Sequence, residues 1–238
     1  MSTLSRRRFV HTLAGAAVVL GTAITLPASA QGNGYQLIQP PQNTSVTDQV
    51  EVVEFFWLGC PHCYSLEPDM LAWEARIPDN TVFVREAPPL NPSWEQHSRG
   101  FYAARALGIE EPFVHAMFEA IHEQGDRMRK PGDIAELAAT LGADRDTFLK
   151  TMDSFTVETA LRRSVQLAQG AGISGVPSIM INGKYLTGAS LAGGNAGVID
   201  VYDISEDCRA PVLAAIGNRM VDENTTLTFT ASATDSDD

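Results

Sequence analysis

The chain has 238 residues, of which 44% are hydrophobic and 19% are charged, and its formal net charge is -12. This composition is that of a globular domain large enough to bury its own core, and it excludes collagen-like, coiled-coil, wholly disordered and polytopic membrane proteins. The acidic balance argues against a nucleic-acid partner, because a surface that follows a phosphate backbone is normally basic.

The first thirty residues have the order of an export signal. Arginines at 6–8 precede an uncharged apolar run over 13–26, and small residues end at Ala30. The run is too short to span a bilayer, which takes about 20 apolar residues. We therefore expect residues 1–30 to be a signal peptide cleaved after Ala30, by the twin-arginine or the general secretory route, which delivers the protein to a compartment where disulfides persist.

After a polar lead-in over 31–48 that has no regular period, the sequence predicts a strand, a turn and a helix. Residues 50–57 are β-branched and aromatic and have the length of a strand, and the helical pattern resumes at Pro61 and runs to Ala75. A second strand is predicted over 81–86, where apolar residues alternate. Prolines then end regular structure.

The middle of the chain, residues 93–170, has helical periodicity and predicts four or five helices without strands. A strand follows over 178–181. The dipeptide Asn182-Gly183 is a strong hairpin signal, and residues 184–187 supply the returning strand. The sheet therefore resumes after the helices.

Two of the three cysteines form the motif Cys60-Pro61-His62-Cys63, at the point where the predicted strand gives way to a helix. Unpaired N–H groups and the helix dipole favour negative charge there, and such sites lower a cysteine pKa from about 8.5 into a range of about 3.5 to 7.5. Cys60 is therefore predicted to be a reactive thiolate, with Cys63 as the resolving thiol. Pro61 suits a first helical turn, and His62 adds a donor or a positive charge beside the Cys60 sulfur.

The segment 54–63 with its C-P-H-C motif, the helical stretch after the second strand and the G-V-P-S sequence over 175–178 together resemble the DsbA family of periplasmic thiol:disulfide oxidoreductases. The resemblance covers residues 35–204. It implies an α/β protein with a thioredoxin fold and an inserted helical subdomain. It also implies that Val176-Pro177 is a cis peptide facing the cysteine pair, where the neighbouring backbone holds a substrate strand. The cis expectation rests on the resemblance, since only about 5 to 6% of X-Pro bonds are cis, and the alternative is an ordinary proline that opens a strand.

The chain is expected to divide into five segments, the last of which departs from the DsbA family. We expect a signal peptide over 1–30, the first part of the thioredoxin-like domain over 31–92, a helical insertion over 93–170, the second part over 171–208, and a tail over 209–238. A short helix is also predicted over 195–204. The tail resembles the start of a bacterial cadherin-like or immunoglobulin-like repeat, but it is too short for such a module, so we expect disorder or a truncated fragment. Its aspartates hint weakly at calcium, and Cys208 is predicted to be an unpaired thiol.

Glu54 lies six residues before Cys60 in a strand whose other members are mostly Val and Phe. We expect its carboxyl group to point into apolar surroundings, to have a raised pKa and to relay the proton of Cys63. The DsbA family has an acidic residue at the matching place. The alternative is a solvated glutamate at the sheet edge beside Glu51.

A C-x-x-C pair can also be half of a zinc site, with His97, His115 and His122 as further ligands. The remaining cysteine is Cys208 in the tail, and a proline and a histidine between the thiols suit redox use better. We therefore expect no metal.

The resemblance implies an exported thiol:disulfide oxidase whose only redox group is the Cys60-Cys63 disulfide, with no cofactor. It would oxidise newly exported cysteine-containing proteins and be reoxidised by a membrane quinone-linked partner of the DsbB type. We expect a periplasmic monomer with no nucleic-acid partner. One alternative is a reductase or isomerase on the same fold, which differs in redox potential. The alternative from another class is a calcium-dependent surface or adhesion module carried by the tail.

Overall fold

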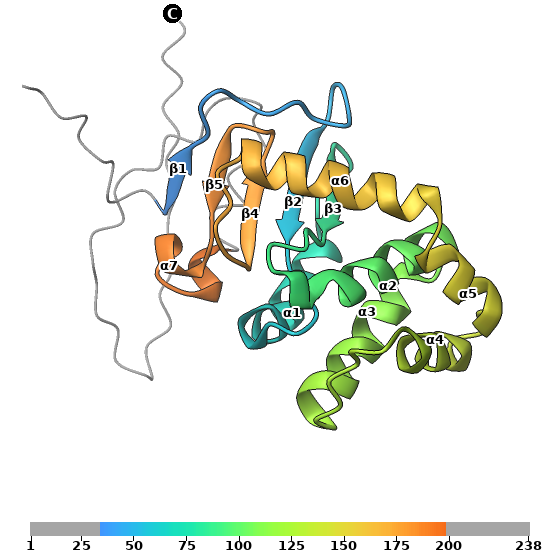
Figure 1. Cartoon of the computed structure of the whole chain (residues 1–238). Coiled ribbons are helices and arrows are strands. Elements are labelled where there is room, and N and C mark those ends of the chain that lie inside the picture. The colour runs from blue at the N-terminus through green and yellow to red at the C-terminus, as the bar shows by residue number, and fades with distance from the viewer. Residues whose placement is uncertain (1–33, 199–238) are drawn as a thin grey trace, which may run out of the picture. The chain divides into compact units, whose positions relative to one another are not determined.

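The computed structural model describes residues 34–198. These residues contain a mixed five-stranded sheet. Its spatial order is β1-β5-β4-β2-β3 (Figure 1). The strands are β1 (Tyr35–Leu37), β2 (Val50–Phe55), β3 (Thr81–Glu86), β4 (Ser178–Ile181) and β5 (Tyr185–Thr187). Strands β2 and β3 are parallel, whereas the other neighbouring pairs are antiparallel.

Helices cover both faces of the sheet, which explains why all six residues of the central strand β2 are buried. On one face, α1 (Pro61–Glu74) packs Met70 and Trp73 against Val50 and Val52. On the other face, α6 (Phe155–Gly170) crosses in front of the sheet, as Figure 1 shows, and its Ala168 joins the cluster of Val53 and Phe55. Alternate residues of β2 therefore serve two cores.

The helices between β3 and β4 form a third core, rich in phenylalanine. They are η1 (Pro92–Trp94), α2 (Glu95–Ala106), α3 (Glu110–Phe118), the π-helical turn η2 (Glu119–Glu123), α4 (Pro131–Thr140), α5 (Arg145–Met152) and α6. Asp144 and Ser154 cap α5 and α6 by accepting hydrogen bonds from backbone N–H groups. Because α6 contributes Val157 to this core and Ala168 to the sheet, it belongs to both parts of the protein.

The predicted hairpin is present, but the lead-in contains a strand that the sequence did not predict. Asn182 and Gly183 both adopt positive φ, at 49° and 65°, as the two-residue turn requires. Strand β1 pairs antiparallel with β5, with Tyr35 opposite Thr187. The three residues of β1 are too few to show the alternation of a strand, and the strand with which they pair lies about 150 positions away in the sequence.

Several predictions fall partly or wholly outside the described residues. The signal peptide over 1–30, the tail over 209–238 and Cys208 lie there. The short helix predicted over 195–204 is helical at 195–198, and its remainder also lies outside. A further short helix, α7 (Ala189–Ala192), was not predicted. Within residues 34–198, no helix has both the length and the apolar character needed to cross a membrane.

Candidate active site

The cysteine motif lies at the start of α1, as the sequence predicted. Cys60 is the N-cap residue, with extended backbone angles, and Pro61 occupies the first helical turn. The Cys60 N–H donates to the Trp57 carbonyl at 2.9 Å and closes a turn between β2 and the helix. Gly59 leaves room in this turn for the ring of Trp57, because a Cβ atom there would lie 2.3 Å from the ring and would force it to move.

The thiol of Cys60 is largely buried and yet favours the ionised form. Hydrogen bonding from the Cys63 thiol is the largest factor that lowers the pKa of Cys60 to about 6, and it outweighs the effect of burial. The backbone N–H groups of Cys63 and His62 lower it further, and the charge of His62 contributes least among these causes.

The second thiol has the opposite character. Cys63 is completely buried, and this burial, reinforced by its hydrogen bond to Cys60, raises its pKa far above the usual range for a thiol. Both cysteines are free thiols in this structure. The pair therefore consists of one thiol that ionises readily and one that keeps its proton.

The loop before β4 lies against the cysteine pair. The Val176-Pro177 peptide bond is cis, as the resemblance implied, and Gln39-Pro40 is a second cis bond that was not expected. The carbonyl oxygen of Val176 lies 3.5 Å from Cys60 Sγ. This contact joins residues that are 116 positions apart in the sequence.

Glu54 is buried, with 1% of its surface exposed, so the solvated alternative at the sheet edge is wrong. Its surroundings are nevertheless not wholly apolar, which corrects the prediction. Arg85 donates from Nε to Glu54 at 3.2 Å and from Nη2 to both oxygens of Glu67 at 2.9 and 3.0 Å. Two carboxyl groups therefore share one buried guanidinium group.

Burial dominates the electrostatics of this cluster. It raises the pKa of Glu67 to about 7 and also raises the pKa of Glu54, although Arg85 opposes both shifts. The cluster is coupled to the thiols, because the charge of Glu54 helps to raise the pKa of Cys63, and the charge of Cys60 helps to raise that of Glu54. A change in the protonation of the thiols therefore changes the electrostatic environment of the Glu54 carboxyl group.

The three histidines considered as zinc ligands have other contacts. Nε2 of His97 lies 3.1 Å from the Arg127 carbonyl oxygen, and Nε2 of His122 lies 2.8 Å from that of Leu58, whereas His115 is exposed. Among residues 34–198, no three His, Cys, Asp or Glu side chains gather in a way that could hold a metal ion. The zinc alternative therefore has no geometric support in this part of the chain.

Comparison with known proteins places this site in a family. The DSBA-like thioredoxin domain matches residues 87–192. The thiol:disulfide interchange protein DsbA of Azotobacter vinelandii is 39% identical over 173 residues, which cover 71% of this chain and 80% of that protein. The Burkholderia cepacia DsbA is 37% identical over 185 residues, 77% of this chain and 87% of that protein. The chain belongs to the DsbA family.

A solved structure gives the same result for the fold. The crystal structure of Pseudomonas aeruginosa DsbA matches with a TM-score of 0.68 and 33% identity, over 72% of this chain and 89% of that one. The predicted thioredoxin fold with its helical insertion is confirmed. This DsbA-family protein is a thiol:disulfide oxidoreductase that introduces disulfide bonds into exported proteins, and the names of its relatives do not favour the reductase or isomerase alternative.

Sequence reasoning missed Arg85 and Glu67, which complete the charge cluster. A signal for Arg85 was present, because Glu54 and Arg85 are each the fifth residue of their strand and lie opposite each other in the parallel register. Recognising it required the assumption that the two strands are adjacent. The sequence contains no comparable signal for Glu67, since a glutamate in a helix is usually exposed.

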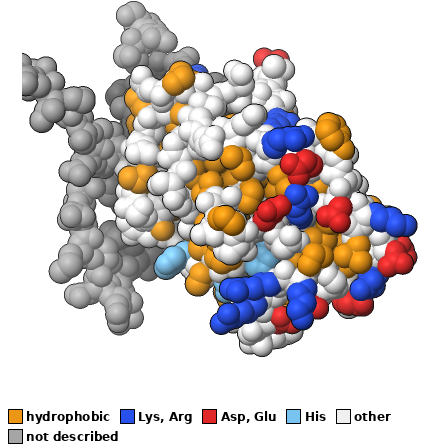
Figure 2. All heavy atoms as spheres, in the orientation of Figure 1, with side chains coloured by type: hydrophobic (Ala, Val, Ile, Leu, Met, Phe, Trp, Pro, Cys, Tyr) orange, Lys and Arg blue, Asp and Glu red, His pale blue; other side chains and the backbone are white. Residues whose placement is uncertain are grey.

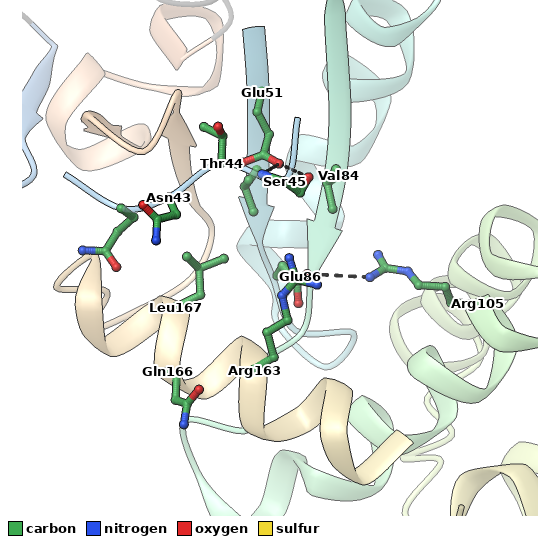
Figure 3. Close-up of a pocket in the computed structure, with 12 residues that line it drawn as sticks. Asn43, Thr44, Ser45, Glu51, Val84, Glu86, Arg105, Arg163, Gln166 and Leu167 are labelled. Carbon is green, nitrogen blue, oxygen red and sulfur yellow. Dashed lines mark hydrogen bonds and ion pairs between the residues drawn. The ribbon is translucent and has the colours of Figure 1, made fainter. Parts of the chain in front are cut away.

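A separate pocket of about 410 Å³ in this DsbA-family protein lies against the α6 face of the sheet. Its lining includes Glu86 at the end of β3, toward which Arg163 points from α6, while Arg105 reaches the same carboxylate at 3.7 Å (Figure 3). None of the four motif residues lines this pocket. On the same face, acidic and basic side chains are interspersed over the helical insertion, with apolar side chains exposed between them (Figure 2).

Proposed function

We propose that Cys60 and Cys63 carry the disulfide that this protein donates. A substrate thiolate attacks Cys60 Sγ, and the bond between the two enzyme sulfurs breaks. Cys63 leaves with the electron pair and takes up a proton. A second substrate thiolate then attacks the substrate sulfur of the mixed disulfide and releases Cys60 as a thiolate. The substrate loses two electrons, and the enzyme is left as a dithiol.

The observation that carries this division of roles is the contrast between the two thiols. Cys60 is at the end of α1, with a pKa lowered to about 6, so it is a stable leaving group at neutral pH. Cys63 is buried with a raised pKa, so once released it holds its proton and does not re-form the disulfide readily. Because ionisation of Cys60 stabilises the reduced protein relative to its disulfide, the couple is oxidising.

Substrate is proposed to bind along the backbone at Val176 and Pro177. The Val176 carbonyl oxygen lies 3.5 Å from Cys60 Sγ, so an extended chain that pairs with this backbone brings its cysteine to Cys60. Pro61 and His62, which are both exposed at the start of α1, flank the same approach.

Glu54 is proposed to hold or pass on the proton of Cys63. Its buried carboxyl group has a raised pKa, and its charge and that of the thiols influence one another. A group of this kind can accept the proton when Cys63 must become a nucleophile again, which happens during reoxidation. The hydrogen bond to Arg85 keeps the carboxyl group in place on β2.

Membership of the DsbA family supports a proposal for reoxidation and location. We propose that a membrane quinone-linked protein of the DsbB type restores the disulfide, and that the protein acts in the periplasm as a monomer, without a cofactor and without a nucleic-acid partner. Its substrates are newly exported proteins that contain cysteine. The signal peptide is expected to be cleaved after Ala30, by either export route.

Replacement of each cysteine tests the assignment. Cys60→Ser should abolish oxidation of a reduced, unfolded substrate such as ribonuclease. It should leave the melting curve of the reduced protein nearly unchanged at about pH 5, below the pKa of Cys60, where ionisation of this thiol adds no stability. Cys63→Ser should keep a reactive Cys60 that forms mixed disulfides with oxidised glutathione, detectable by mass spectrometry. Full oxidase activity in Cys60→Ser, or the absence of any adduct in Cys63→Ser, would overturn the assignment.

A further inference from the structure

The π-helical turn η2 contacts the chain on both sides of the cysteine motif. His122 contacts Leu58, two residues before Cys60, and Tyr64, the residue that follows Cys63. A π-turn is rare and occurs frequently at functional sites, because it changes the direction in which side chains leave a helix. In this protein the turn follows directly from α3 and belongs to the helical insertion.

The contact before the motif is a hydrogen bond of defined direction. Nε2 of His122 lies 2.8 Å from the carbonyl oxygen of Leu58. A carbonyl oxygen can only accept, so Nε2 carries the hydrogen and donates it. Leu58 lies inside the turn that the Cys60 N–H closes on the Trp57 carbonyl. The imidazole therefore holds the turn that leads into Cys60.

The contacts after the motif involve the first turn of α1. The ring of Tyr64 stacks on that of His122, with centroids 4.8 Å apart and planes 7° apart, and its hydroxyl group donates to Glu123. Phe118 packs beside both rings, at 5.8 Å from each. The same short segment of the insertion thus contacts the chain two residues before Cys60 and one residue after Cys63.

The first turns of α1 are held less firmly by the rest of the helix than usual. Pro68 lies inside the helix and has no N–H to donate to the carbonyl group of Tyr64, so the first two turns lack one bond to the rest of the helix. The ionisation of Cys60 depends on the N–H groups of His62 and Cys63 pointing at its sulfur. A small rotation of this helix start relative to the turn would weaken those interactions.

We propose that His122 is a positioning residue for disulfide exchange, which holds the Leu58 turn and the first turn of α1 in the arrangement that the reactive sulfur of Cys60 requires. This inference rests on the proposed function, because it takes Cys60 as the reactive thiol. His122 contacts neither sulfur through any hydrogen bond found in residues 34–198. It acts through the backbone at Leu58 and through the ring of Tyr64.

Three variants of the full protein separate positioning from general stability. His122→Leu removes the donor, whereas His122→Gln places an amide N–H near the position of Nε2 and can still donate to Leu58. His115→Leu is the control, because His115 lies seven residues earlier, is exposed and has a distant ion pair with Glu119, at 3.8 Å. The readouts are the pKa of Cys60 from thiolate absorbance and the equilibrium constant with glutathione.

We expect His122→Leu to raise the pKa of Cys60 and to shift the glutathione equilibrium at least about threefold toward the protein disulfide, since half a pKa unit corresponds to that factor. His122→Gln should recover most of the change, and His115→Leu should match the parent protein. A lowered melting temperature in His122→Leu with an unchanged Cys60 pKa and equilibrium would overturn the proposal, because it would show a structural role alone.

If His122→Leu does not fold, Tyr64→Leu decides the question. This change removes the ring that stacks on His122, while His122 can still donate to Leu58, so it should shift both readouts in the same direction by a smaller amount. Unchanged values in a folded Tyr64→Leu protein would then overturn the proposal. Failure of the proposed function is distinguishable, since it would appear as oxidase activity in Cys60→Ser, whatever the His122 variants show.

Discussion

At the scale of single residues, the chemistry depends on the different surroundings of two thiols that lie three positions apart. Cys60 lies at the open end of a helix, and Cys63 lies one turn further in with no exposed surface. The spacing alone was enough to predict a low pKa for Cys60, because helix ends and C-x-x-C pairs act locally. The order of the causes was not predictable, since it depends on the hydrogen bond between the thiols.

Replacement of His62 by Leu tests that order. The charge of His62 contributes least among the factors that lower the pKa of Cys60, so His62→Leu should raise this pKa by less than about one unit. Because one unit corresponds to about 30 mV for a two-electron couple, the potential should become more negative by less than that amount. Thiolate absorbance and glutathione equilibration measure the two quantities. A rise of two units or more would instead make His62 a main cause of the low pKa of Cys60.

At the scale of elements, one buried guanidinium group links β2, β3 and α1 in addition to their backbone pairing and apolar packing. Arg85 on β3 binds Glu54 on β2 and Glu67 on α1, and all three side chains are buried. Removing one partner from a buried ion pair typically destabilises a protein by about 3 to 5 kcal/mol, because it leaves an uncompensated charge. The cluster thus couples the strand that carries Glu54 to the helix that carries the cysteines.

We expect Arg85→Leu to lower the free energy of unfolding by about 3 to 5 kcal/mol at pH 8, as measured with urea. The loss should be smaller at pH 6, because the raised pKa of Glu67, about 7, lets this carboxyl group protonate as the pH falls. Arg85→Lys is the matched control, since it keeps the charge. Adding Glu67→Gln to Arg85→Leu should recover part of the loss. A loss below about 1 kcal/mol at pH 8 would show that the cluster is not a stabilising contact.

Some elements of the fold could be predicted from the sequence, and others could not. Residues 50–55, 61–74 and 81–86 were predicted closely, because apolar periodicity and a helix-starting proline are local signals. The short strand β1 was missed because its hydrogen bonds run to β5, far along the chain. The contact of His122 with Leu58 was also missed, since it depends on the fold of the insertion and on a π-turn that breaks the regular helical spacing.

At the scale of the whole molecule, redox state and stability are linked through Cys60. Its pKa in the folded dithiol form is about 6, below the value of about 8.5 expected for an unfolded chain. Between these two values the unfolded chain binds a proton that the folded protein does not, so the free energy of unfolding rises with pH. The disulfide form has no thiol at this position and lacks this contribution.

We therefore expect the stability of the reduced protein, relative to the oxidised protein, to increase by about 2 to 3 kcal/mol between pH 6 and pH 8.5, because the slope of about 1.36 kcal/mol per pH unit flattens near each of the two pKa values. The contribution is full near pH 8.5 and is lost as the pH falls through about 6. Glu67, whose pKa is raised, acts in the opposite direction up to about pH 7, but it is present in both redox forms and largely cancels in the comparison. Urea unfolding of both forms across this range measures the difference.

The reduced form of Cys60→Ser supplies the control for this measurement. It keeps Glu54, Glu67 and Cys63 but has no thiol that ionises near pH 6, so its stability should follow the pH dependence of the oxidised protein. The raised pKa of Cys63 makes that thiol matter near the upper end of the range, where the unfolded chain begins to ionise and the folded protein does not, and this effect is shared by the reduced parent protein and by Cys60→Ser. If the reduced protein showed no extra rise with pH, Cys60 would not be a stabilised thiolate, and its proposed role as the leaving sulfur would lose its physical basis.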